Sequence, residues 1–219
     1  MVSLQLFGHP FSSFTQKALI ALYADGTDFE FRMLDPEHAE NGAEFAAAWP
    51  IGKFPLLRDG ERTIPETTPI IEHLQAHHRG ANQWIPDGDL GREVRLLDRI
   101  FDAYVMSPMQ RIVAEALRPV GSKDSYGLAQ AHDLLGRAYD WLEQRLPDDG
   151  WLAGGAFSLV ECAAAPSLFY ADWVQQIGGA RPKLAAYRAR LLAHRAVARC
   201  VDEARPFRSY FPLGAPDRD

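Results

Sequence analysis

Hydrophobic and polar positions follow two different patterns along the chain, and the pattern changes near residue 80. Before that point, short stretches typical of β-strands alternate with stretches whose apolar residues recur at helical spacing. The pattern predicts strands at residues 3–7 and 29–34, a hairpin around the Asp59-Gly60 turn, and helices at residues 13–24, 43–48 and 70–78. This β-α-β-α-β-β-α order indicates a small mixed sheet with helices packed on it.

Beyond residue 89, every element is predicted to be helical. Residues 80–89 are rich in Gly, Pro and Asn and show no periodicity, so we expect a linker there. Apolar residues then recur at helical spacing at residues 90–117, with an interruption at Ser107-Pro108, and at residues 124–146, 158–176, 182–192 and 196–203. The tail, Arg205–Asp219, contains too much Pro and Gly for a helix, but its three aromatic residues favour packing onto the folded chain.

Composition and charge narrow the possible partners. The 219-residue chain is 47% hydrophobic and 24% charged, as in ordinary soluble proteins, and its net charge of −6 argues against binding nucleic acid. We expect no membrane partner, because no apolar run reaches the roughly 18 residues that span a bilayer. The N-terminus lacks the pattern of a signal peptide, and Cys162 and Cys200 make no disulfide framework, so we expect a cytoplasmic location.

Histidines cluster near the end of the third predicted helix. His73 and His77 are four residues apart, with His78 adjacent, and this spacing can hold zinc. The sequence shows neither a third ligand nearby nor the H-E-x-x-H order of a zinc hydrolase. We therefore interpret the three histidines as a solvated helix face and expect no metal.

Three short segments carry candidate chemistry. Ser12 and Ser13 stand where the first helix begins, so a hydroxyl and free backbone N–H groups can bind an anion there, or one serine can simply cap the helix. Pro55 stands at the start of a strand. Either this proline simply begins the strand, or the bond before it is cis and turns the Phe54 backbone toward an open site. Glu66 precedes a third helix start, where Pro69 suits the first turn and Thr67 or Thr68 would be the cap.

In this order and spacing, the segments resemble the cytosolic glutathione S-transferase family, of the serine type and bacterial-like. Ser12-Ser13-Phe14 with Lys17 is similar to the family's Ser-Pro-Phe-x-x-Arg/Lys, and residues 52–56 are similar to Gly-Lys-Val-Pro-x-Leu with its cis-proline. Glu66-Thr67 stands where the family has Glu-Ser, and residues 151–161 are similar to its C-terminal Leu-x-Gly-x-x-x-Ser-x-Ala-Asp. Ser13 replaces the usual proline and Thr67 the usual serine, although Thr67 keeps the hydroxyl.

The resemblance covers nearly the whole chain and implies an α/β thioredoxin-like N-terminal domain followed by an all-α C-terminal domain. We expect a glutathione-binding domain at residues 1–79, a linker at 80–89, and a helical domain with an irregular tail at 90–219. The resemblance implies that glutathione is the cosubstrate and that no metal is needed. It also implies a two-fold homodimer that forms through the N-terminal domain and the first long C-terminal helices. Glu161 completes a capping box, S-x-x-E, with Ser158 in the C-terminal motif.

The resemblance also implies roles for individual residues. Ser12 stabilises the glutathione thiolate, and the tripeptide is bound by six further residues: Lys53, Phe54, Pro55, Glu66, Thr67 and His38. His9 is an alternative candidate as a base, although a histidine in Gly-His-Pro also fits a plain loop. The electrophile pocket is expected around Phe11, Tyr104, Met106, Met109 and Arg111, with ordinary interhelical core as the alternative for the helical residues. The tail either folds along the first long helix and covers this pocket, or packs elsewhere and only stabilises the fold.

The predicted function is transfer of the glutathione thiolate to small hydrophobic electrophiles. A glutathione-dependent isomerase of the maleylacetoacetate type shares the fold and the serine, and Arg111 and Arg118 are available to bind its substrate's carboxylates. A non-catalytic binding module of the same fold is the third hypothesis, which the intact Ser12, Pro55 and Glu66 disfavour.

Overall fold

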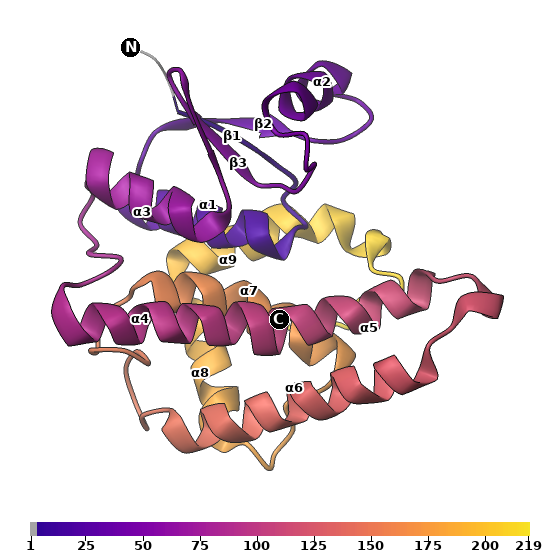
Figure 1. Cartoon of the computed structure of the whole chain (residues 1–219). Coiled ribbons are helices and arrows are strands. Elements are labelled where there is room, and N and C mark those ends of the chain that lie inside the picture. The colour runs from indigo at the N-terminus through magenta and orange to yellow at the C-terminus, as the bar shows by residue number, and fades with distance from the viewer. Residues whose placement is uncertain (1–3) are drawn as a thin grey trace.

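The computed structural model describes residues 4–219 and shows a small sheet above a bundle of helices (Figure 1). The N-terminal part contains β1 (Leu4–Gly8), α1 (Ser13–Asp25), β2 (Phe29–Met33), α2 (Ala39–Ala48), β3 (Leu56–Asp59), β4 (Arg62–Pro65) and α3 (Thr67–His77). The strand order is β2-β1-β3-β4, with β1 and β2 parallel and the other pairs antiparallel. The predicted thioredoxin-like arrangement is therefore confirmed, and Ser3, predicted to be in the first strand, lies outside the described residues.

The two faces of the sheet are buried against different helices. Leu4, Leu6 and Leu57 join the large core that α1 and α3 share with the helical part. Phe7 and Leu56, which point to the opposite face, form a smaller cluster with Phe45 of α2. This alternation is what a strand with period two produces, and it leaves α1 and α3 between the sheet and the helical bundle (Figure 1).

The helical part contains α4 (Gly88–Ile100), α5 (Ser107–Leu117), α6 (Ser125–Arg145), α7 (Leu159–Val174), α8 (Pro182–Ala193) and α9 (Arg195–Ala204). Helix α7 is almost completely buried at the centre, and the predicted Ser158–Glu161 capping box is present at its start. Among residues 4–219, no helix has both the length and the apolar character that crossing a bilayer requires.

The interruption predicted at Ser107-Pro108 is a change of helical winding and not a break. A π-helical segment, Phe101–Met106, joins α4 to α5, so that the three run as one rod (Figure 1). Pro108 has no N–H to continue the backbone hydrogen-bond ladder, and it directly follows the π-helical segment, whose winding differs from that of an α-helix. The wider winding shifts the side chains that follow around the helix axis.

The predicted linker is firmly anchored. Helix α3 ends at His77 and α4 begins at Gly88. Between them, Trp84 is fully buried, and its Nε1 donates to Asp25 Oδ2 at 2.9 Å. The backbone N–H of Leu159, at the start of α7, donates to the Trp84 carbonyl at 3.0 Å, so this irregular stretch ties α1 to the helical bundle.

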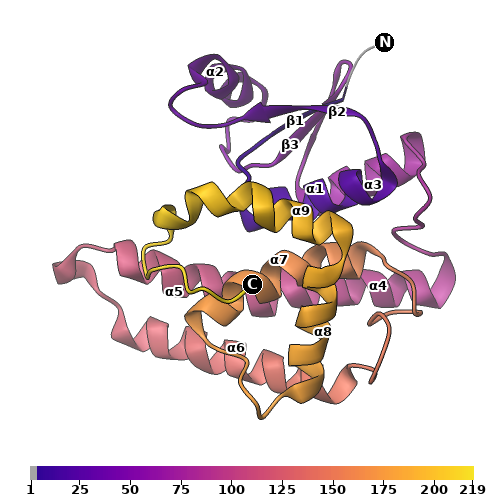
Figure 2. The ribbon, with the colours of Figure 1, turned by 180° about the vertical axis from the view of Figure 1, so that it is seen from behind.

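The tail packs onto the protein, as predicted, and Leu213 lines a groove beside Ile112 and Ala116 at the C-terminal end of α5. Residues Arg205–Tyr210 form a 3₁₀ helix, which Pro206 permits because it lies in the first turn, so the expectation of no helix is wrong there. The rings of Phe211 and Trp173 lie 5.0 Å apart, and Phe207 lies 4.6 Å from His9, so the aromatic part covers α7 and the β1–α1 loop (Figure 2).

Candidate active site

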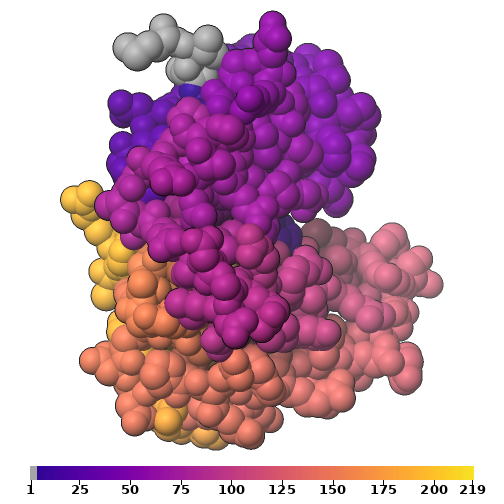
Figure 3. Space-filling view, turned by 60° about the vertical axis from the view of Figure 1, so that its left-hand side comes forward, coloured from indigo at the N-terminus to yellow at the C-terminus, as the bar shows by residue number. Residues whose placement is uncertain are grey.

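A cavity of about 380 Å³ opens where the N-terminal domain meets α5, and the surface is hollowed between the two parts (Figure 3). Four segments contribute to it: the start of α1, the loop before β3, the start of α3, and α5. Its lining consists of Ser12, Phe14, Gly52, Lys53, Phe54, Pro55, Glu66, Thr67 and Gln110. The structure thus brings together Ser12 and five of the six residues predicted to bind the tripeptide.

Ser12 is the N-cap of α1. Its Oγ accepts a hydrogen bond from the Thr15 N–H at 3.3 Å, which leaves the hydroxyl proton available for a ligand in the cavity. Ser13 is buried in the first helical turn and does not line the cavity. The free N–H groups and the positive end of the helix dipole at this point favour a negatively charged ligand.

The loop before β3 forms the opposite wall. The Phe54-Pro55 peptide bond is cis, as the sequence predicted. Gly52 has a φ of +71°, a conformation that glycine adopts without strain. Lys53 and Phe54 are exposed at the mouth of the cavity, so a cation and an aromatic ring border it.

The start of α3 differs from its prediction. The helix begins at Thr67, and neither threonine caps it with its side chain; the cap position belongs to Glu66. Glu66 has a φ of +70°, which is strained for a residue with a side chain and is typical of functional sites. Glu66 is exposed at the cavity, whereas Thr67 is 4% exposed and forms part of its lining.

Directly behind the cavity lies a buried ionic network. Lys17 is 1% exposed, and its Nζ lies 2.6 Å from Asp98 Oδ1 and 2.9 Å from Asp102 Oδ2. Thr68 Oγ1 accepts from Lys17 at 3.2 Å and donates to Asp98 at 2.8 Å. Burial raises the pKa of the Asp102 carboxyl. The network therefore joins the starts of α1 and α3 to the long helix of the C-terminal part.

Two predicted histidines have other partners. His9 Nδ1 accepts from the Phe11 N–H at 3.1 Å, and burial lowers the pKa of the ring. His38 lies 2.7 Å from Asp35, and this hydrogen bond raises the pKa of His38. Neither histidine lines the cavity, so the structure does not bring His38 together with the other predicted tripeptide-binding residues.

The residues expected around the electrophile are also dispersed. Met106 and Met109 are buried in the core, as the alternative interpretation held, and Phe11 packs against Tyr170 with ring centres 5.4 Å apart. Tyr104 lies beside Trp141 of α6 in a separate shallow groove, and Arg111 lies 3.5 Å from Asp124. None of these five residues lines the Ser12 cavity.

The residue that α5 does contribute is Gln110, which was not among the residues predicted from the sequence. It lies between two residues that were predicted, Met109 and Arg111. Helical spacing alone could not select it, because the π-helical segment shifts the face that α5 turns toward the sheet.

Comparison with known proteins shows which protein family this chain resembles. Residues 6–82 match the family model for the glutathione S-transferase N-terminal domain, and residues 125–190 match that for the C-terminal domain. Glutathione S-transferase F6 of Arabidopsis thaliana is 28% identical over 186 residues, which cover 78% of this chain and 84% of that protein. A glutathione S-transferase of Hyoscyamus muticus is 24% identical, with 92% of this chain and 99% of that one covered.

Solved structures agree on the fold. A glutathione S-transferase of Methylobacillus flagellatus with GSH bound has a TM-score of 0.80 at 22% identity, covering 90% of this chain and 98% of that one. Glutathione transferase F7 of Populus trichocarpa has a TM-score of 0.76 at 22% identity, covering 92% and 99%. With both domain models matched in order and relatives along most of its length, this chain belongs to the glutathione S-transferase family of enzymes.

Proposed function

We propose that this protein conjugates the thiolate of glutathione to small hydrophobic electrophiles, with Ser12 as the thiolate-stabilising residue. The observation that carries the proposal is the convergence of Ser12, Glu66 and Thr67 on one cavity at two helix starts. These groups suit the two ends of a γ-glutamyl-cysteinyl compound: a hydroxyl for the sulfur, and a carboxylate and a hydroxyl for the amino-acid end.

Activation of the thiol follows from the start of α1. A free thiol has a pKa of about 8.5, and lowering it by two units requires about 2.7 kcal/mol of preferential binding to the thiolate. The Ser12 hydroxyl donates to the sulfur, and the helix dipole adds to this effect. Because the Ser12 oxygen already accepts from the Thr15 N–H, the oxygen is held at the helix start, and its O–H can turn toward the sulfur.

The rest of the tripeptide lies along the loop before β3. Glu66 takes the γ-glutamyl ammonium, Thr67 takes its carboxylate, and the Phe54 backbone pairs with the cysteinyl part as an added strand does. We assign the glycyl carboxylate to Lys53, which borders the cavity, in place of His38, which is paired with Asp35.

The electrophile is proposed to lie beside Phe14 and Gln110, at the side of the cavity that faces α5. The isomerase alternative needs cations for two carboxylates. Arg111 is close to Asp124, and Arg118 is paired with Glu115 at 3.1 Å, so both have acidic partners away from the cavity. The transferase is therefore favoured, and parallel assays with an aryl halide and an unsaturated diacid separate the two activities.

The decisive experiment compares the two neighbouring serines. Calorimetric titration with glutathione measures affinity, and thiolate absorbance against pH measures the pKa of the bound thiol. S12A should raise that pKa and lower turnover by roughly ten- to a hundredfold, the worth of one hydrogen bond to a charged group. S13A should change neither quantity much. Equal losses in both variants would contradict the assignment, and glutathione binding without any turnover would indicate a binding module.

We also propose a two-fold homodimer and a cytoplasmic location. The exposed large apolar side chains of these helices include Leu96 of α4, Tyr104 of the π-helical segment and Trp141 of α6, and a partner subunit would cover these three. The free thiols of Cys162 and Cys200 fit a reducing compartment. Light scattering over a range of concentrations tests the dimer, and a monomeric mass throughout would exclude it.

A further inference from the structure

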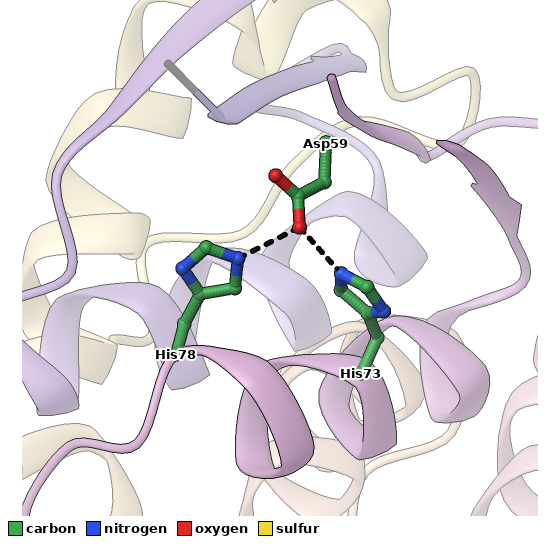
Figure 4. Close-up of side chains that lie close together, drawn as sticks. All are labelled: Asp59, His73 and His78. Carbon is green, nitrogen blue, oxygen red and sulfur yellow. Dashed lines mark hydrogen bonds and ion pairs between the residues drawn. The ribbon is translucent and has the colours of Figure 1, made fainter. Parts of the chain in front are cut away.

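Two of the three histidines at the end of α3, His73 and His78, have a partner that the sequence did not reveal. Asp59, the last residue of β3, lies opposite these two residues, and its Oδ2 is 2.9 Å from His73 Nε2 and 2.8 Å from His78 Nε2. Figure 4 shows both rings approaching this one oxygen from the helix below. One ligand atom from each residue lies within 4.8 Å of the others.

The end of α3 makes this convergence possible. Residues five apart on an ideal helix point about 140° apart and cannot meet at one atom. His78, however, follows the last helical residue and has a φ of −132°, so its side chain leaves the helical spacing and turns to the carboxylate that His73 faces. The hairpin supplies the third group from a separate element.

We propose that Asp59, His73 and His78 bind one divalent transition-metal ion of the zinc class. Two imidazole nitrogens and one carboxylate oxygen are the donor set that zinc, cobalt and nickel prefer over magnesium or calcium. Zinc–ligand distances near 2.1 Å place tetrahedral ligands about 3.4 Å apart, so the carboxylate oxygen has to move about 0.5–0.6 Å away from the two ring nitrogens, now at 2.9 and 2.8 Å, to make room for the ion. A fourth position stays open for water or an added ligand.

His77 is not part of the proposed site. Its ring packs at a tilt of 43° against that of His73, with centres 4.5 Å apart, and its Nε2 lies 3.3 Å from a guanidinium nitrogen of Arg62. His77 therefore serves as a matched control: the same residue type on the same helix, next to the site but facing an arginine.

Binding would clamp the β3–β4 hairpin to the C-terminal end of α3. The opposite ends of these elements carry Pro55 and Glu66 at the glutathione cavity. The ion is thus expected to stabilise the domain without touching the cavity, and this inference does not depend on the proposed transferase activity.

The test uses the full chain without a histidine tag, stripped of metal by a chelator and kept free of glutathione, whose thiol binds zinc. Both cysteines are buried and compete little for the ion. Titration with Zn²⁺ by calorimetry, and with Co²⁺ by visible absorbance, should show one ion per chain and a raised melting temperature. H73Q and H78Q should each weaken binding by at least about tenfold.

Two controls keep the result interpretable. H77Q should bind as the parent does, and so should H38Q, which removes the other Asp–His pair, Asp35–His38. His73 is largely buried and H73Q can unfold the chain, so His78, whose side chain is 30% exposed, provides the second variant. Absence of saturable binding at one ion per chain, or equal affinity in the parent and H78Q, overturns the proposal and leaves a hydrogen-bonded clamp.

Discussion

Thr67 and Thr68 are neighbours in the sequence but belong to two different environments. Thr67 lines the open cavity with Ser12 and Glu66, whereas Thr68 is hydrogen-bonded to Lys17 and Asp98 in the buried ionic network. Helices α1 and α3 contribute to both regions. In the cavity their polar groups are available to a ligand, and in the network such groups are satisfied by one another.

This difference shows how an open site is held in place. Polar groups that are free to bind a ligand do not form hydrogen bonds with one another. Other contacts must therefore hold the starts of α1 and α3 in position. The Lys17 network does this, because it joins α1 and α3 to Asp98 of α4 and Asp102 of the π-helical segment. We therefore expect changes in the network to affect stability and changes in the cavity to affect glutathione binding.

The largest effect is expected when Lys17 is removed. K17M leaves two buried carboxylates without their cation and should lower the free energy of unfolding by about 3–5 kcal/mol, measured by urea denaturation. The matched variant K53M, at the exposed mouth of the cavity, should change stability by less than about 0.5 kcal/mol and weaken glutathione binding.

The pH dependence of K17M sharpens this test. Burial raises the pKa of Asp102 in the folded state, and a carboxyl with a raised pKa contributes stability at low pH that is lost as the pH rises through that pKa. The deficit of K17M relative to the parent should therefore be smaller in mildly acidic than in neutral solution. If the stability difference between the parent and K17M instead grows at lower pH, Lys17 is not the group that keeps the Asp102 carboxylate charged.

The threonine pair tests the comparison most directly. T68V should cost about 1–3 kcal/mol of stability, because it leaves buried groups of the network without their hydrogen-bond partner. T67V should leave stability nearly unchanged and weaken glutathione binding by roughly ten- to a hundredfold. T67S, which keeps the hydroxyl, should bind as the parent does. A loss of stability in T67V together with a loss of glutathione affinity in T68V would contradict the roles assigned to the two residues.

Replacing Glu66 should have a smaller effect on stability, of the opposite sign to its effect on glutathione binding. E66G relieves the backbone strain at a φ of +70° and should raise stability by about 1 kcal/mol, while the affinity for glutathione falls. E66Q keeps the strain and loses the charge, so it should lose affinity without gaining stability. A destabilised E66G would show that the side chain supports the fold.

The smallest effect is expected at His9. A general base would contribute a factor of about 10²–10⁴ to turnover, but H9N should lower it by less than about tenfold. The ring accepts from the Phe11 N–H and packs against Phe207 of the tail, so its loss should appear mainly as reduced thermal stability. A pH–rate profile that loses its acidic limb in H9N would restore the base hypothesis.

Much of the site was predictable because its signals are local. A serine at a helix start, a proline at a strand start and an acid before a helix depend on a few consecutive residues, and the structure brings Ser12, Pro55 and Glu66 to one cavity. The electrophile side was not predictable in this way. It depends on which face a long helix turns toward the sheet, and the π-helical segment between Phe101 and Met106 changes that face.

By itself, the sequence determined the order of strands and helices, the hairpin turn, the capping box of Ser158 and Glu161, and the change from a mixed to a helical part. Hydrophobic periodicity and helix-capping residues encode these features within short stretches of consecutive residues. Only the tertiary structure decided that Asp59 meets His73 and His78, that Trp84 anchors the connecting segment on Asp25, and that the tail lies on Trp173. Each of these contacts joins residues far apart in the chain, and their distance depends on how whole elements pack.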